Sequence, residues 1–420
     1  ALMYLETGRY VITGITISSK ADMSELSKTE PELAKRYEEL RRQYAKASKD
    51  LEKREKYREA REIQRDEQIR QIPGWQTFQL ALSEDAVKYL AMEGPIVVVN
   101  ATPICCDAIV ITQEIISVVK LHEMTYKKLA EYLATTTISD ALLRLWTVAV
   151  EPILAATPLT PSRRVWWLTT GIAGRAPFHA ASDHRPGSAN NASSHAISSY
   201  IPSLKALHFS RSKRSNSAQA QMMLLVTMST NPAPHHNLDT SYEEAAITKT
   251  FGTSKTHIAH PTPEDVLSLL PNFPFVHFAC HGASIAYDPS QSGLLLTQNN
   301  PPAMITISDL EVDLIEGAIA YLSACFTAEQ PDGKLADEAI HLANSFQALG
   351  FQHVIGTIWG ADDRAAGEVA RVFYERVFER ESGVGGWDVA GALHGAVKAY
   401  KDEENADVVT WGPFVHIGSS

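Results

Sequence analysis

The chain has 420 residues, of which 45% are hydrophobic and 21% charged, and its formal net charge is -11. A chain of this length and composition is expected to fold into two to three domains with a sizeable core, and it is not typical of a disordered protein. The acidic balance argues against a nucleic-acid partner, because proteins that bind phosphate backbones need a basic face.

The number of cysteines and the N-terminal sequence predict where in the cell the protein is located. Four cysteines are too few for a disulfide framework in a chain of this size, so we expect a reducing, cytoplasmic location. The first residues lack a basic stretch followed by an apolar one, so no signal peptide is predicted. No apolar run reaches the roughly 18 to 20 residues of a spanning helix, and we expect no membrane partner. Residue 1 is not Met, so we interpret the chain as a fragment.

The N-terminal region, residues 1–93, is expected to be helical. Thr29 and Glu32 have the spacing of a capping box, which predicts a helix start at this point. The stretch 49–70 is dominated by charges of both signs with a thin apolar line. It is interpreted as a solvated helix, with a partner-binding coiled-coil arm as the alternative. A further helix is predicted over 75–92.

From residue 94 onward, predicted strands and helices alternate along the chain. The strands are expected at 96–100, 107–111, 165–169, 222–228, 274–279, 317–323 and 352–358. The helices are expected at 125–155, from 241, and at 263–270, 335–349, 363–380 and 386–401. This alternation predicts an α/β fold with a mostly parallel sheet and helices on both faces.

Two of these strands end on reactive side chains. The run 275–279 is followed by Cys280, His281 and Gly282, and the run 318–322 is followed by Ser-Ala-Cys325. Both runs are short and uncharged, as in buried strands of a parallel sheet. Chemistry in such sheets gathers beyond the carboxyl ends of the strands. His281 and Cys325 can therefore meet, although they are 44 residues apart (325 minus 281).

These residue types point to nucleophilic catalysis. A Cys325 thiolate would attack, and His281 would act as general base and then as acid toward the leaving amine. Gly282 has no side chain, so its N–H and that of Cys325 can form an oxyanion hole. The alternative is a buried core cysteine with an unrelated histidine at a strand end.

Cys280 is expected to face the core, because successive residues of a strand point to opposite faces. A metal site built from His277, Cys280, His281 and Cys325 is the other interpretation. No pair among them has metal-ligand spacing in a suitable context, so we expect no metal and no cofactor.

Several acidic residues, one histidine and three tryptophans are weaker candidates for a functional role. Asp332, Asp337 and Glu338 either line a pocket for a basic side chain or cap the helix that follows them. Asp362 is predicted to cap the next helix. The remaining candidates are expected to be structural: a satisfied histidine and three core aromatics, namely His179, Trp166, Trp167 and Trp359.

Several runs resemble the CHAT domain, a family of caspase- and separase-related cysteine proteases. They are Val276 to Gly282, Tyr321 to Cys325, Gly350, Ile355 to Trp359 with Asp362 or Asp363, Trp166-Trp167, Pro177 to Ala181, Ser199 to Ser203 and Ala390 to Leu393. Residues 5–9 and the helix 31–51 look like the segment that joins tetratricopeptide repeats to a CHAT domain in fungal proteins.

The resemblance implies a caspase-like α/β fold in two parts. Residues 1–93 would link to an absent repeat region, and residues 94–420 would form the protease domain. Within that domain, 94–270 would be a pseudo-protease-like half and 271–420 the catalytic half.

The resemblance also implies a function and a site. It implies a cysteine endopeptidase of the clan CD type, with a dyad on Cys325 and His281, that hydrolyses a protein substrate. An N-terminal repeat sensor would regulate it through a partner, in immune or cell-death signalling. The alternative function is a non-catalytic pseudo-protease that acts as an interaction scaffold.

Overall fold

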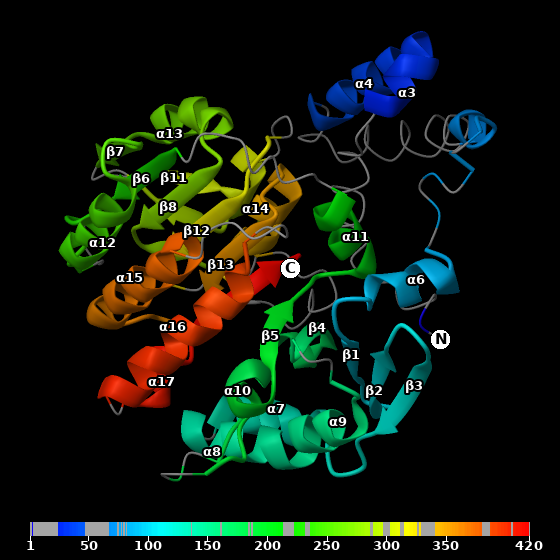
Figure 1. The fold of residues 1–420 in the computed structure, drawn as a ribbon, viewed down its shortest axis with the longest axis vertical. Helices are drawn as coiled ribbons and strands as arrows, with labels where there is room; N and C mark the ends of the chain where they lie inside the picture. Colours follow the sequence, from blue (N-terminus) through cyan, green and yellow to red (C-terminus); the bar gives the residue numbers. More distant parts are fainter. Residues whose placement is uncertain are drawn as a thin grey trace.

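The computed structural model describes residues 2, 24–46, 67–73, 75–76, 78, 80, 82–135, 137–159, 162–183, 185, 188–212, 222–231, 236–285, 289–296, 303–310, 315–325, 327–328, 341–379, 387–404 and 406–419. The described chain is organised around one 11-stranded sheet, which runs from β3 at one edge to β7 at the other (Figure 1). None of its helices is long and apolar enough to cross a membrane.

The main sheet and a small second sheet contain all the named strands. Those of the main sheet are β1 (Ile96–Ala101), β2 (Cys106–Ile111), β3 (Ile116–Lys120), β4 (Arg164–Gly171), β5 (Ile197–Tyr200), β6 (Met223–Thr227), β7 (Lys255–Ala259), β8 (Phe275–Ala279), β12 (Ile319–Ser323), β13 (His353–Thr357) and β14 (Phe414–Gly418). The small sheet holds β9 (Gly282–Ala283), β10 (Gly293–Leu295) and β11 (Met304–Thr306).

The helices follow the same chain order. They are α3 (Ser24–Thr29), α4 (Pro31–Lys46), α6 (Glu84–Leu90), α7 (Tyr126–Thr135), α8 (Ile138–Leu145), α9 (Glu151–Ala156), α10 (Ala192–His195), α11 (Leu204–Ser212), α12 (Ser241–Phe251), α13 (Pro263–Leu269), α14 (Leu342–Leu349), α15 (Asp363–Glu379), α16 (Val389–Glu404) and α17 (Val408–Trp411). A π-helical turn, Trp146–Val150, joins α8 to α9.

The sheet contains two blocks of parallel strands, and β2 and β3 form an antiparallel edge beside β1. The strand order is β3-β2-β1-β4-β5-β14-β13-β12-β8-β6-β7. Strands β1, β4 and β5 run parallel to one another, and so do β13, β12, β8, β6 and β7. β14 lies between the blocks, antiparallel to β13 and parallel to β5. The predicted α/β fold with a mostly parallel sheet is confirmed.

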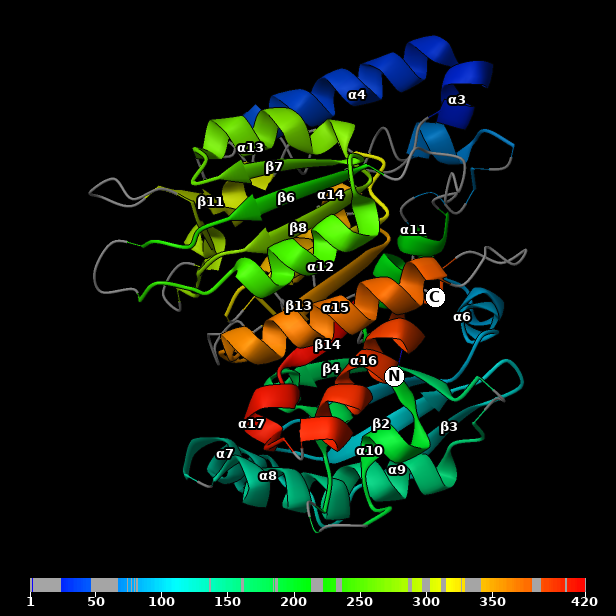
Figure 2. The same cartoon turned by 60° about the vertical axis from the view of Figure 1, so that its left-hand side comes forward.

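Helices cover both faces of the larger block. Helices α12, α15 and α16 pack on one face (Figure 2), and α13 and α14 pack on the other. Every residue of β8 and β12 is buried. Central parallel strands covered on both faces have to be apolar throughout, which is why these two runs were recognisable in the sequence.

The described part of residues 1–93 contains helices α3, α4 and α6, but two details of the prediction were wrong. A helix does start at Pro31, yet Thr29 is the last residue of α3, and its hydroxyl donates to the Leu26 carbonyl at 3.3 Å instead of capping α4. The helix expected over 75–92 is limited to α6, because Ser83 caps it by accepting from the Ala86 N–H at 3.2 Å. Most of the charged stretch 49–70 lies outside the described residues.

Four strands of the main sheet were not predicted: β3, β5, β7 and β14. Each is only four or five residues long, and β3 and β7 are edge strands with alternating exposure. The predicted boundary between the two halves, at residue 270, falls between β7 and β8 in the sequence. In the sheet, however, β7 and β8 lie on either side of β6 in one block. The division into two halves stays a prediction.

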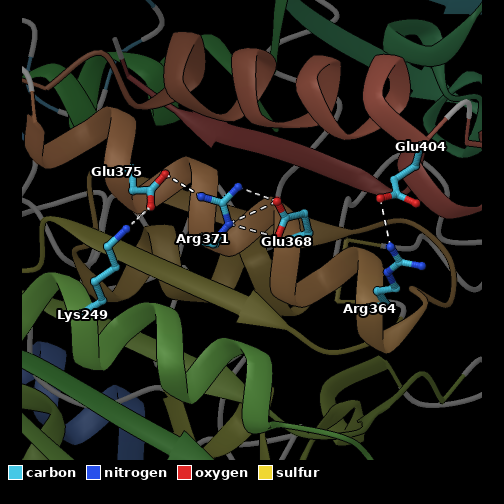
Figure 3. A network of polar contacts seen from close by, with 6 residues as sticks. All are labelled: Lys249, Arg364, Glu368, Arg371, Glu375 and Glu404. Carbon is cyan, nitrogen blue, oxygen red and sulfur yellow. Dashed lines mark hydrogen bonds and ion pairs between the residues drawn. The ribbon is translucent and has the colours of Figure 1, made fainter.

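Ion pairs join α15 to its two neighbouring helices (Figure 3). Lys249 of α12 lies 2.7 Å from Glu375 of α15, and Arg371 lies 2.8 Å from the same carboxylate. Arg364 of α15 lies 2.9 Å from Glu404 of α16. All are partly exposed, so each is worth at most about 1 kcal/mol. Their role is to fix α15 in place against α12 and α16.

Candidate active site

The ends of β8 and β12 are neighbours. The two strands pair in parallel register, and the last pair matches Ala279 with Ser323. His281 and Cys325 each lie two residues beyond that pair. The structure thus brings the two predicted residues to the same level of the same sheet edge, at the carboxyl end of the larger strand block.

The alternation of side chains decides which residues face each other there. Tyr321 of β12 and His277 of β8 point toward α15, where their rings stack at 4.7 Å and His277 Nδ1 lies 2.8 Å from the hydroxyl of Tyr374. His281 and Cys325 share the parity of these residues. Cys280 has the opposite parity and lies 1% exposed in the core beneath α14, as predicted.

A backbone carbonyl orients His281. Its Nε2 lies 2.7 Å from the carbonyl oxygen of His236, in the loop between β6 and α12, and the two imidazole rings meet edge to face at 4.8 Å. A carbonyl can only accept, so Nε2 carries the proton. Nδ1 is therefore the nitrogen that can take a proton from a nucleophile.

Cys325 follows β12, and its side chain lies beside the start of α15. Its Sγ is 3.6 Å from the position that a Cβ on Gly360 would occupy, and the Ala361 N–H donates to it. Burial raises the pKa of the thiol above its ordinary value, although the Ala361 N–H acts in the opposite direction, and the Asp363 carboxylate adds to the increase. At neutral pH the side chain is therefore a thiol.

Gly282 fits closely against the backbone of Cys325. A Cβ placed on it would overlap the carbonyl oxygen of Cys325, so no other residue is accommodated without a backbone shift. In the small sheet Gly282 pairs with Leu294, and the Leu295 N–H donates to the His281 carbonyl at 2.9 Å. Gly282 and Leu294 therefore form a non-hydrogen-bonded pair of the antiparallel ladder. The N–H of Gly282 consequently points away from β10.

One loop connects the histidine to the cysteine side of the site. The Asp239 N–H donates to Asp363 at the start of α15 at 2.8 Å, three residues after His236. The β6–α12 loop is thereby held against both His281 and the helix that contacts Cys325. Sequence reasoning missed this loop, because a backbone carbonyl leaves no signature in the residue type that carries it.

The other predicted residues have structural roles or lie outside the described part of the chain. His179 is structural, as expected: its Nδ1 lies 2.9 Å from Tyr200 Oη and its Nε2 lies 2.8 Å from the Gly412 carbonyl. Asp362 caps α15, as predicted, by accepting from the Ala365 N–H at 3.1 Å. Asp332, Asp337 and Glu338 lie outside the described residues, so their pocket or capping role stays a prediction.

The tryptophans divide into two kinds. Trp166 and Trp167 are fully buried, as expected for core aromatics. Trp359 is not: it is half-exposed, donates from Nε1 to the Val409 carbonyl at 2.8 Å, and immediately precedes Gly360 beside the thiol. Among the described residues no group of three or more His, Cys, Asp or Glu side chains is arranged to hold a metal ion.

Comparison with known proteins gives three results. A family model described as the CHAT domain matches residues 139–419. A search of curated proteins finds no match to this chain. Among solved structures, the Saccharomyces cerevisiae separase–securin complex aligns with a TM-score of 0.54 and 10% identity, over 80% of this chain and 30% of that chain.

Two further structures are similar. A second separase–securin structure aligns with a TM-score of 0.54 and 9% identity, over 84% of this chain and 33% of that chain. The Arg-specific cysteine proteinase gingipain R aligns with a TM-score of 0.44 and 12% identity, over 69% of each chain. The chain therefore spans about a third of the separase chain, and the likeness to separase shows a shared caspase-like fold.

Proposed function

The chain belongs to the CHAT domain family, and from this premise we propose that it is a cysteine-type endopeptidase that cleaves a protein substrate. The observation that carries the proposal is the parallel register of β8 and β12, which delivers His281 and Cys325 to one face at one sheet edge. The fold supports it as well, because β8 and β12, the two strands that end on reactive side chains, are direct neighbours in the sheet.

The proposed reaction begins from a protonated thiol. His281 Nδ1 removes the proton from Cys325 Sγ as the sulfur attacks the scissile carbonyl carbon. The N–H groups of Gly282 and Cys325 stabilise the negative oxygen of the tetrahedral intermediate. The C–N bond then breaks, and the leaving amine receives the proton from His281. A water molecule, deprotonated by His281, hydrolyses the acyl-enzyme and restores the thiol.

Two features of the structure suit this sequence of steps. The His236 carbonyl holds the imidazole in one tautomer and stabilises its protonated form after proton transfer. The Ala361 N–H, just before the start of α15, donates to the sulfur, which favours a developing thiolate. The site is thus built to activate the thiol at the moment of attack.

We also infer that a protein partner regulates the chain. The separase structures are complexes with securin, and their similarity to this chain supports protein-based control. A repeat array N-terminal to α3 would act as the sensor, in a reducing cytoplasm, during immune or cell-death signalling.

The test is cleavage profiling of this chain with a peptide library, followed by labelling with a peptidyl acyloxymethyl ketone built on the preferred sequence. The reagent should alkylate Cys325, and His281→Ala should slow that labelling by about a hundredfold or more, because the base is lost. Labelled sites are read by peptide mass spectrometry.

Iodoacetamide labelling of exposed Cys105 supplies the control, since it should proceed equally in both proteins. If Cys325 reacts at the same rate with and without His281, and no peptide is cleaved, the chain is a non-catalytic scaffold and the proposal fails.

Gly282→Ala is expected to reduce cleavage by about a hundredfold or more, since a displacement of about 1 Å at a reacting centre has that effect. The added methyl group overlaps the Cys325 carbonyl and separates the ends of β8 and β12. Initial rates with the best library peptide measure it.

Gly395→Ala is the matched control, because its new methyl group meets only the flexible end of Arg376 on α15. That variant should retain wild-type cleavage. Unimpaired cleavage by Gly282→Ala would contradict the close approach of Gly282 to the nucleophile.

A further inference from the structure

A cavity lies at the seam between the two sheet blocks, where β5 adjoins β14. Helix α16 contacts both β5 and β14 there, beside α17 and α10 (Figure 2). Its walls include Ser193, Ser198 and Tyr200 from the N-terminal block, and the inner face of α16 from the other. We call this cavity the seam pocket.

Basic side chains dominate the polar lining of the seam pocket. His394, Lys398 and Lys401 are spaced four and three residues apart along α16, which places them on one helical face. No carboxylate of the described residues lines the pocket. The acids that act on these groups, Asp388 on His394 and Asp402 on Lys401, belong to the ends of the same helix.

Burial disfavours the charged forms of two of these side chains, His394 and Lys401. Burial lowers the pKa of His394 to about 4, with Arg163 and Lys398 acting in the same direction. Burial also lowers the pKa of Lys401. An anion among these groups would supply the missing countercharge in a partly desolvated position, where such interactions are strong.

The remaining wall is apolar and aromatic. Leu393 and Val397 of α16 form it together with Trp411 and Phe414. Lys401 Nζ lies 4.8 Å from the centroid of the Trp411 ring, so the cation and the aromatic surface adjoin. A ligand that fills the pocket therefore needs an apolar body next to an anionic head.

The position of the pocket gives such a ligand a structural effect. β5 and β14 are joined by a single register pair, Tyr200 with Ile417, whereas β13 and β14 pair over five residues. The β5–β14 ladder therefore has the fewest register pairs of any ladder in the main sheet. A ligand held by α16 on one side and by β5 on the other would stabilise the two blocks against each other.

We propose that the seam pocket binds a small organic anion, with an apolar body and a phosphate or carboxylate head, and that the bound anion bridges the two sheet blocks. The head lies between Lys398, Lys401 and His394, and the body packs on Trp411. This site is separate from Cys325 and His281 and does not depend on the proposed protease activity.

The test uses phenyl phosphate as the probe and the isotope-labelled histidines of the full chain as reporters. Titration should shift the His394 imidazole resonances and raise the pKa of that ring, while exposed His257 on β7 stays unchanged. The same titration should raise the melting temperature, because only the folded chain has the pocket.

The double variant Lys398→Gln/Lys401→Gln should weaken phenyl phosphate binding by about tenfold or more, through loss of two charge-assisted contacts. Lys120→Gln/Lys127→Gln, which removes the same charge from the N-terminal block, should bind as the wild type does. Single lysine variants replace the double variant if it does not fold.

Four results would overturn the proposal. Phenyl phosphate that leaves His394 unaffected, or that binds the double variant equally well, excludes the site. Equal binding of neutral benzyl alcohol excludes recognition of the charge. Equal binding of inorganic phosphate excludes recognition of the apolar body.

Discussion

Cys325→Ala is expected to abolish cleavage of the best library peptide, and His281→Ala to reduce it by at least about three orders of magnitude. The first variant removes the sulfur that forms the acyl-enzyme in the proposed mechanism. The second removes the base from a thiol whose pKa burial has raised, so no appreciable thiolate forms at neutral pH. Single-turnover assays with excess enzyme measure both losses.

Cys280→Ala is the matched control, since it makes the same chemical change in the residue next to His281. Cys280 lies in the core cluster beneath α14 and faces away from the reacting atoms. The variant should lose about 1–2 kcal/mol of unfolding free energy, as for a small buried cavity, and retain cleavage. Cleavage that survives in Cys325→Ala but disappears in Cys280→Ala would refute the assignment.

The second large effect concerns acid stability. A chain of buried polar groups crosses four neighbouring strands: Arg164 donates to Ser199 Oγ at 3.0 Å, Ser199 Oγ lies 2.7 Å from His416 Nδ1, and His416 Nε2 lies 3.1 Å from His353 Nδ1. Burial, with Arg164 nearby, lowers the pKa of His353 to about 3. Burial lowers the pKa values of His179 and His341 to about 4.

The sign of the pH dependence follows from these depressed values. The unfolded chain binds protons near pH 6.5, whereas the folded chain does not until about pH 4 or below. The stability is therefore complete above pH 6.5 and falls as the pH decreases. Each such histidine contributes about 1.4 kcal/mol per pH unit, so the three together should remove several kcal/mol between pH 6 and pH 4.

Urea unfolding at a series of pH values measures this slope. His353→Gln should reduce it by the equivalent of one proton, although it also weakens the seam. An unfolding free energy that is constant from pH 7 to pH 4 would show that the pKa values of these three histidines are not lowered in the folded chain.

Strands could be predicted from the sequence where burial on both faces makes every residue apolar. β8 and β12 are covered on both faces, so their apolar runs stood out, and the reactive residues at their ends could be named. The alternation of strand side chains also assigned Cys280 to the core correctly. Short strands such as β5 and β7 were missed because four or five residues with mixed exposure give no distinct period.

The sequence by itself determined the α/β class, the family resemblance and the two strand ends that carry the candidate dyad. Only the tertiary structure decided that His281 donates to the His236 carbonyl, that the thiol lies at the start of α15, and that the two sheet blocks meet at one register pair. The physical reason is the range of the interactions. Side-chain periodicity is local and is written in residue types, whereas backbone partners, burial and strand direction arise when distant segments pack together.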